Sequence, residues 1–139
     1  VAAEGAKFVV AYVKIGLAPD GGVTHFLNAS LPRQLVTEMC LTGNPVEADR
    51  LHVLGLVNAV APVGDALATA QDMAAKLAAG TVGAMAIIKD EIGAAATNDL
   101  ATHLAVEAGG INRARFGAEA AEGLSAFLEK RKPDFAGKA

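Results

Sequence analysis

The sequence predicts the mostly helical portion of an α/β fold, with one or two short strands that belong to a sheet completed elsewhere. Apolar residues make up 53% of the 139 residues, aromatic residues only 4%, and there are 15 glycines. Alanine supplies much of the apolar share, which favours helices that approach one another closely. Only residues 8–13 and 56–60 have the short, apolar, β-branched pattern of a strand. Because two short strands cannot build a sheet layer, the fold is expected to be incomplete by itself.

Turn-forming residues divide the first part of the chain into short elements. Pro32 suits the first position of a helix, and Gly43, within Thr42-Gly43-Asn44-Pro45, would end that helix. The predicted elements are, in order, a short strand or extended segment over 8–13, a loop over 16–22, helices over 22–27, 34–41 and 47–54, and a strand-like link over 56–60 closed by Pro62.

Four helices with little chain between them are predicted in the second part. Asp65 stands where a capping side chain is favoured, Asp99 lies near the start of the third helix, and Pro133 stops the last one. The expected ranges are 65–79, 82–96, 98–115 and 118–130. Their small residues indicate tight helix packing, of the kind found between subunits.

Charge and cysteine content narrow the class of protein. A formal net charge of −3 gives no reason to expect a nucleic-acid partner. The single Cys40 lies in an apolar helical pattern, which predicts a buried thiol, and the lack of an internal disulfide suits the cytoplasm. The apolar runs are too short to span a bilayer, and residues 1–20 lack a signal-peptide pattern. Because Val1 is not a natural start, a piece of a longer chain is expected.

One carboxylate stands on a turn rich in proline and glycine, Gly16-Leu17-Ala18-Pro19-Asp20-Gly21-Gly22, that opens a helix. Such a turn offers free backbone N–H groups and a locally positive field. Asp20 therefore has two interpretations, a helix cap or a working acid/base, and the residues alone leave both open. The histidines lack metal-ligand spacing, so no metal site is predicted; they are His25, His52 and His103.

Several motifs follow one another along the chain in a fixed order. They are Phe8, Gly16-Leu17-Ala18-Pro19-Asp20-Gly21-Gly22, Leu41-Thr42-Gly43, Leu54-Gly55-Leu56-Val57-Asn58, Lys89, Glu107 and the run EGLSAFLEKRKPDF from Glu122 to Phe135. Over essentially the whole chain, this order closely resembles the C-terminal half of the enoyl-CoA hydratase/isomerase (crotonase) family. Within that family it is most similar to the ring-opening isomerases of phenylacetate degradation.

The resemblance implies a crotonase-like (ClpP/crotonase) spiral of ββα units supplied by a missing N-terminal half. Residues 1–62 would then end the spiral core and carry the Pro-Asp-Gly-Gly loop, and residues 63–139 would form a helical region for trimerisation and for covering coenzyme A. The implied protein is a homotrimer or a hexamer (a dimer of trimers) in the cytoplasm, with no membrane or nucleic-acid partner. Its ligand is an acyl-CoA thioester, so coenzyme A arrives as part of the substrate and no separate cofactor is needed.

The resemblance also implies a reaction. The N–H groups that polarise the thioester carbonyl fall in the missing half, so residues 1–139 alone are expected to be inactive. Hydratases of the family use two carboxylates, and one of these positions is occupied here by Tyr12, a poor base at neutral pH. Asp20 resembles the aspartate that shuttles a proton in some isomerases. Double-bond isomerisation of an enoyl-CoA is therefore predicted, with enoyl-CoA hydration and a non-catalytic oligomerisation fragment as the alternatives.

The same alignment assigns the residues around the substrate. Those that would line the acyl pocket, or else form ordinary core, are Ala11, Tyr12, Ile15 and Leu17. Gly21 and Gly22 would allow close backbone approach, or simply make a turn. Phe127 aligns with an aromatic residue beside the acyl or pantetheine channel, and Lys130 with a basic residue near the adenosine phosphates. Lys130, Arg131 and Lys132 form a cationic cluster that phosphate would favour, or a solvated face.

Overall fold

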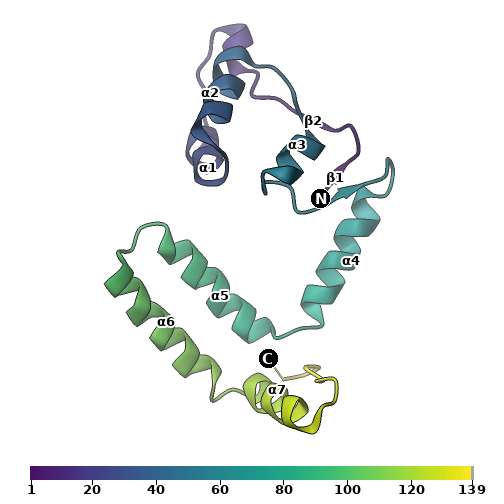
Figure 1. Cartoon of the computed structure of the whole chain (residues 1–139), viewed down its shortest axis with the longest axis vertical. Coiled ribbons are helices and arrows are strands. Elements are labelled where there is room, and N and C mark those ends of the chain that lie inside the picture. Colours follow the sequence, from purple (N-terminus) through teal and green to yellow (C-terminus); the bar gives the residue numbers. More distant parts are fainter. Residues whose placement is uncertain (139) are drawn as a thin grey trace. The chain divides into compact units, whose positions relative to one another are not determined.

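The computed structural model describes residues 1–138 and divides the chain into two compact units, which meet in sequence between Asp72 and Met73 (Figure 1). The division falls within helix α4 (Ala66–Ala78). The sequence prediction placed a boundary after residue 62, before this helix begins. Each unit has its own set of packed elements.

The first unit combines short strands with short helices. Its elements are β1 (Ala2–Ala3), β2 (Lys7–Phe8), the 3₁₀ helix η1 (Tyr12–Ile15), α1 (Val23–Ser30), α2 (Arg33–Thr42), β3 (Val46–Glu47), α3 (Ala48–Val53) and β4 (Val60–Ala61). Strands β1 and β4 pair in parallel. Strands β2 and β3 pair antiparallel, with Lys7 opposite Glu47 and Phe8 opposite Val46. The strands are two residues long, as expected of sheets that are incomplete.

The strand predicted over residues 8–13 is wrong beyond Phe8. The ladder with β3 stops there, and the chain turns into η1, where the N–H of Lys14 donates to the carbonyl of Ala11 at 3.0 Å. A β-branched run forms a strand only when a neighbouring strand is in register, and that neighbour is not encoded locally. The link predicted over 56–60 likewise pairs only at its end, in β4. As a result, Tyr12 is placed on a tight helical turn.

The core of the first unit lies between α2 and α3. Leu51 is fully buried, and Val36 and Met39 are 3% and 2% exposed. Helix α2 ends at Gly43 with φ 60°, a left-handed conformation that glycine adopts without strain, as the sequence predicted. Cys40 is half-buried against this core.

The second unit is helical among its described residues. Its helices are α5 (Val82–Ala95), α6 (Leu100–Ala114) and α7 (Ala118–Glu129), close to the predicted ranges. Helices α5 and α6 run side by side (Figure 1). Asp99 caps α6 by accepting a hydrogen bond from the N–H of Thr102 at 2.7 Å.

Helix α7 also caps α5. The two carboxylate oxygens of Glu119 accept hydrogen bonds from the N–H groups of Gly83 and Ala84, at 2.9 and 3.0 Å. A carboxylate at a helix N-terminus satisfies backbone donors that have no partner within the helix. This contact ties the first and last helices of the unit together. Within residues 1–138, none of the helices combines the length and hydropathy required to span a bilayer.

Candidate active site

The loop between η1 and α1 carries Asp20 back over the 3₁₀ helix. The N–H of Leu17 donates to the carbonyl of Tyr12 at 3.0 Å, which starts this return. At its end, the Tyr12 hydroxyl donates a hydrogen bond of 2.7 Å to Oδ1 of Asp20. Two residues that the sequence singled out separately therefore form a pair. The Asp20 side chain itself is exposed.

The helix-cap interpretation of Asp20 is wrong for its side chain. The N-cap residue of α1 is Gly22, with φ 85° and no side-chain cap hydrogen bond. Only the backbone carbonyl of Asp20 takes part, by accepting from the N–H of Val23 at 3.1 Å. A Cβ at Gly22 would also meet the Phe26 ring at 2.8 Å, so this turn requires glycine. The carboxylate is thus left for another role.

The hydrogen bond fixes which partner holds the proton. The Asp20 carboxylate, as acceptor and as a negative charge, raises the pKa of Tyr12 above its ordinary value of 10.0. Tyr12 is therefore a neutral donor at physiological pH and cannot be the base. Among residues 1–138, no other side chain or N–H donates to the Asp20 carboxylate, and Oδ2 has no donor. That oxygen can accept a proton.

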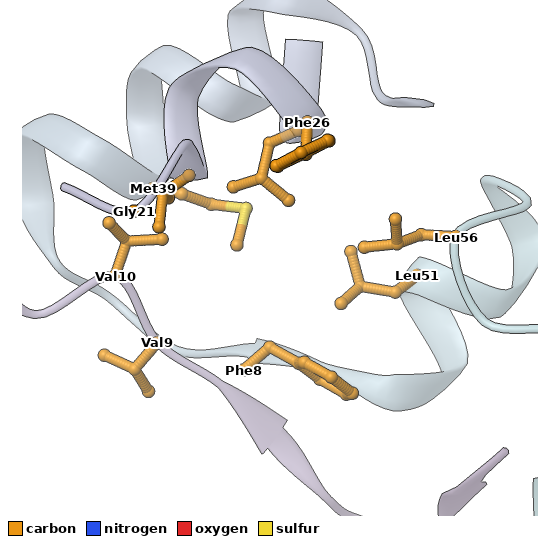
Figure 2. Close-up of a pocket in the computed structure, with 10 residues that line it drawn as sticks. Phe8, Val9, Val10, Gly21, Phe26, Met39, Leu51 and Leu56 are labelled. Carbon is orange, nitrogen blue, oxygen red and sulfur yellow. The ribbon is translucent and has the colours of Figure 1, made fainter. Parts of the chain in front are cut away.

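An apolar pocket of about 340 Å³ lies beside this loop. Phe26, Met39 and Leu51 point toward a common space in it (Figure 2). Its lining residues are almost all hydrophobic: Phe8, Val9, Val10, Gly21, Val23, Phe26, Leu27, Met39, Leu51 and Leu56. Such a lining suits an acyl or aromatic group rather than a charged one.

Of the substrate-binding residues predicted in this unit, only Gly21 lines that pocket. Ala11 and Tyr12 lie on or next to η1, and Ile15 and Leu17 are 75% and 58% exposed. The sequence analysis missed Phe26 and Met39. Phe26 follows Val23 by three residues, and Met39 follows Leu35 and Val36 by four and three. This helical spacing marks an apolar face and was the available signal.

The predicted residues near the C-terminus lie on α7 or just after it. Phe127 is 80% exposed. Lys130 follows the last turn with φ 54°, and its side chain is exposed. Both belong to the second unit, and Asp20 belongs to the first.

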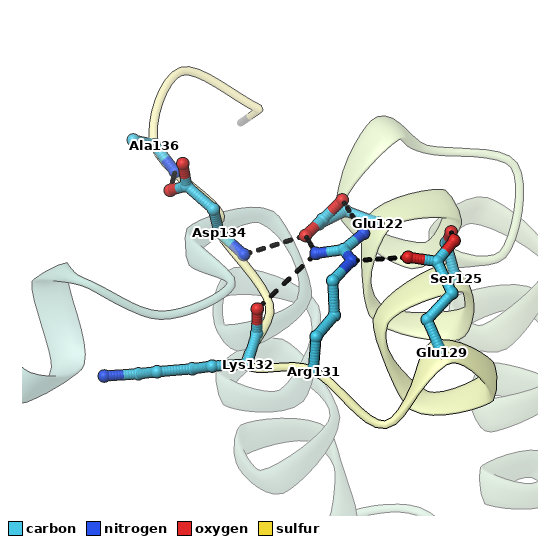
Figure 3. A network of polar contacts seen from close by, with 7 residues as sticks. All are labelled: Glu122, Ser125, Glu129, Arg131, Lys132, Asp134 and Ala136. Carbon is cyan, nitrogen blue, oxygen red and sulfur yellow. Dashed lines mark hydrogen bonds and ion pairs between the residues drawn. The ribbon is translucent and has the colours of Figure 1, made fainter.

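The three consecutive cations do not act alike. Arg131 donates from Nη1 to Glu122 at 2.6 Å and from Nε to Glu129 at 2.7 Å, while the Lys132 ammonium points away (Figure 3). The Arg131 guanidinium, together with the N–H of Asp134, lowers the pKa of Glu122 to about 2. Arg131 is therefore neutralised within the protein, whereas Lys130 and Lys132 form no ion pair among residues 1–138.

Each of the three histidines has a separate set of neighbours. The His25 ring packs edge-on against Phe26. Nδ1 of His52 lies 2.7 Å from the carbonyl of Val57, and Nε2 of His103 lies 3.6 Å from Glu107. Within residues 1–138, no three His, Cys, Asp or Glu side chains are grouped to hold a metal ion.

Comparison with known proteins identifies the family. Residues 1–138 match the family described as enoyl-CoA hydratase/isomerase. This chain belongs to the enoyl-CoA hydratase/isomerase family. It is 38% identical to the 1,2-epoxyphenylacetyl-CoA isomerase of Escherichia coli, over 99% of this chain and 53% of that protein. It is 34% identical to a probable enoyl-CoA hydratase of Rhodobacter capsulatus, over 99% of this chain and 54% of that protein.

Solved structures of family members confirm the predicted crotonase fold. An enoyl-CoA hydratase from Polaromonas sp. JS666 is 44% identical and superimposes with a TM-score of 0.91, over 96% of this chain and 52% of that one. An enoyl-CoA hydratase subunit from Geobacillus kaustophilus gives a TM-score of 0.92 at 29% identity, over 99% and 54%. The chain spans about half the length of these enoyl-CoA hydratase/isomerase relatives, as its short unfinished sheets predicted.

Proposed function

We propose that this chain is the C-terminal half of an acyl-CoA isomerase, in which Asp20 shuttles a proton to move a double bond within an enoyl-CoA thioester. One observation carries the proposal: the Asp20 carboxylate caps no helix, has one oxygen without a donor among residues 1–138, and is followed by Gly21, which lines an apolar pocket. A carboxylate with an accessible oxygen, one residue before a pocket-lining glycine, can act as a general base on a group bound there.

The chemistry requires a single carboxylate. Asp20 would take a proton from a carbon next to the double bond, and the C–H electron pair would pass into the thioester as an enolate. Backbone N–H donors from the other half of the protein would stabilise that oxyanion. The same carboxyl group would return the proton to a different carbon, so that no water is consumed. Hydration needs a second carboxylate to manage water, and Tyr12 occupies one of the positions where that carboxylate is expected.

Similarity to the 1,2-epoxyphenylacetyl-CoA isomerase supports isomerisation within an acyl-CoA of phenylacetate or fatty-acid metabolism. In the proposed enzyme, coenzyme A enters with the substrate, and no other cofactor takes part. Lys130 is assigned to the adenosine phosphates and Phe127 to the edge of the acyl or pantetheine channel. The assembly is proposed to be a trimer or a dimer of trimers in the cytoplasm.

Enoyl-CoA hydration is the second candidate. It is favoured by the similarity to proteins named enoyl-CoA hydratases, from Rhodobacter capsulatus and Polaromonas among others. That reaction would depend on a carboxylate from the other half of the enzyme.

Paired assays on the full polypeptide that contains this chain separate the two reactions. Wild type is expected to convert 3-hexenoyl-CoA to its 2-enoyl isomer faster than it adds water to crotonyl-CoA. Asp20→Asn is expected to lower the isomerisation rate by about 10²- to 10⁴-fold. Dominant hydration that Asp20→Asn leaves unchanged would establish the hydratase instead. No binding of acyl-CoA by calorimetry would favour a non-catalytic assembly role, and turnover by residues 1–139 alone would refute the expected inactivity of this segment.

A further inference from the structure

The anchoring of Tyr12 differs sharply from that of Asp20. The Tyr12 ring is half-buried and packs against the hydrophobic core of the first unit, and η1 packs against α2. Asp20 lies on an exposed loop, where its carboxylate could rotate among several orientations. The one hydrogen bond to that carboxylate in the described chain comes from the anchored residue. Tyr12 therefore has the geometry to select one of these orientations.

No cation competes for the carboxylate in the part of the chain that the structure describes. Asp20 forms no ion pair there. Lys14 shares η1 with Tyr12, but its side chain runs along Gly43 at the end of α2. A phenol orients a carboxylate without cancelling its charge, whereas an ammonium or guanidinium would stabilise the ionised form strongly. The arrangement aligns Asp20 while leaving it a base.

We infer that Tyr12 is a positioning residue that engages Oδ1 of Asp20 and thereby dedicates Oδ2 to proton exchange with the substrate. This role rests on the proposed function of Asp20. In the first step, a C–H bond of the acyl group breaks, the proton forms a bond with Oδ2, and the electron pair moves into the thioester enolate. In the second step, the Oδ2–H bond breaks and the proton forms a C–H bond at the new carbon. Tyr12 keeps its own proton throughout.

Kinetics of the full polypeptide test this role with one substitution and a control. Tyr12→Phe removes only the hydroxyl, and it is expected to lower kcat for 3-hexenoyl-CoA isomerisation about tenfold while KM stays within about twofold. Val13→Ala, on the same 3₁₀ helix, is the matched control and is expected to keep wild-type kcat. In an Asp20→Asn background, Tyr12→Phe is expected to cause no further loss, because the two residues act as a unit.

A spectroscopic titration gives a second, independent readout. Absorbance of the phenolate is followed against pH in wild type and in Asp20→Asn. Removing the negative acceptor is expected to shift one tyrosine titration to lower pH, since the Asp20 charge raises the Tyr12 pKa. Identical titrations would overturn the inference. Because this comparison does not use Tyr12→Phe, it decides the matter even when that variant fails to fold.

The possible failures are distinguishable. If Asp20→Asn abolishes isomerisation but Tyr12→Phe has the same kcat as Val13→Ala, the proposed function stands and the positioning role is overturned. If Asp20→Asn retains full activity, the proposed shuttle fails, and the positioning role fails with it. A loss in Tyr12→Phe that simply adds to that of Asp20→Asn would show a structural effect and would also overturn the inference.

Discussion

The Asp20 carboxylate accepts one hydrogen bond from a neutral phenol, whereas Glu122, near the other end of the chain, accepts from a guanidinium and a backbone N–H. Both carboxylates accept a short hydrogen bond, but Asp20 is exposed whereas the Glu122 side chain is only 13% exposed. Glu122, however, has both oxygens engaged by Arg131, and its pKa is lowered to about 2. Asp20 has one oxygen with no donor in the described chain.

This contrast is between a carboxylate held by a cation and one held by a neutral donor. A carboxylate whose oxygens are occupied by cationic donors stays ionised, so it is a poor proton acceptor and can hold two segments of a protein together. Glu122 has this role, since it joins α7 to the segment that follows the helix, residues 130–138, through Arg131 and Asp134 (Figure 3). The Asp20 carboxylate, by contrast, is exposed and has a single neutral donor among residues 1–138. The two carboxylates therefore differ in how firmly the protein holds their charge, and this difference is what the proposed role of Asp20 requires.

The largest expected effect comes from exchanging each carboxylate for its amide in the full polypeptide. Asp20→Asn should lower kcat for enoyl-CoA isomerisation by about 10²- to 10⁴-fold with little change in the thermal midpoint. Glu122→Gln should do the opposite. It should lower the thermal midpoint and keep kcat within about twofold, because residues 130–138 lose their ion pair with α7. Steady-state kinetics and thermal melts measure both. Equal losses of activity in the two variants would contradict the contrast.

Acid should weaken the contacts that Glu122 makes with Arg131 and Asp134. The pKa of Glu122 in the folded protein is about 2, below its ordinary value of 4.5. A lowered folded-state pKa means that its contribution to stability is fully present above pH 4.5 and is lost as the pH falls toward 2. The protection factor of the Asp134 amide, which is the intrinsic exchange rate divided by the measured rate at the same pH, should therefore fall over this range, because that N–H donates to Glu122. In Glu122→Gln, the protection factor of the Asp134 amide should already be low at pH 5. A protection factor equal to that of wild type would contradict the role given to Glu122.

Alkali should weaken the Asp20 loop instead. The pKa of Tyr12 is raised above 10.0, so its contribution to stability is present below pH 10 and is lost as the pH rises through the higher folded-state value. Above that value, a phenolate would face a carboxylate and repel it. Phenolate absorbance follows the titration, and unfolding monitored by circular dichroism between pH 9 and 12 follows the stability. Tyr12→Phe should lack this alkaline step in stability, and a step of the same size in both proteins would contradict the assignment.

Local patterns predicted most of the helices but not the partners across the chain. Helix α2 ends at Gly43 and α6 begins at Asp99, because these signals act within a few residues of themselves. The strand over 8–13 failed beyond Phe8, since a strand depends on a register that its own residues do not specify. Predictions were therefore right where the interaction joins residues close in sequence, and wrong where it depends on residues far away in the chain.

The candidate site shows the same limit. Tyr12 and Asp20 could each be singled out, but their hydrogen bond depends on how the loop returns over η1. The run Lys130-Arg131-Lys132 looked uniformly cationic because Glu122, which neutralises Arg131, lies two helical turns earlier and meets it only through the turn at Lys130. Pairings that pass through a turn with left-handed backbone are difficult to predict from spacing alone.

Two adjacent glycines on α6 provide the smallest and sharpest test, because the sequence does not distinguish them and the structure does. Gly110 is buried against α5, and a Cβ there would meet Ile87 at 2.9 Å as well as the Glu91 carboxylate. A Cβ at Gly109 would meet only Arg113, at 3.6 Å, which is an ordinary contact. Gly110→Ala should therefore destabilise the protein by about 1–2 kcal/mol through overpacking. Gly109→Ala should stabilise it by about 0.5–1 kcal/mol, because alanine is the better helix former.

Denaturant unfolding of the two glycine variants measures these opposite changes in stability. Neither substitution alters Asp20 or Glu122. Both should retain the kcat of wild type, since α5 and α6 pack within the second unit and Asp20 lies in the first. A gain in stability for Gly110→Ala would mean that α5 and α6 are packed more loosely than the buried glycine indicates. A selective loss of kcat at unchanged stability would mean that the α5–α6 pair contributes to the reaction, and the purely structural role expected of these two helices would then be wrong.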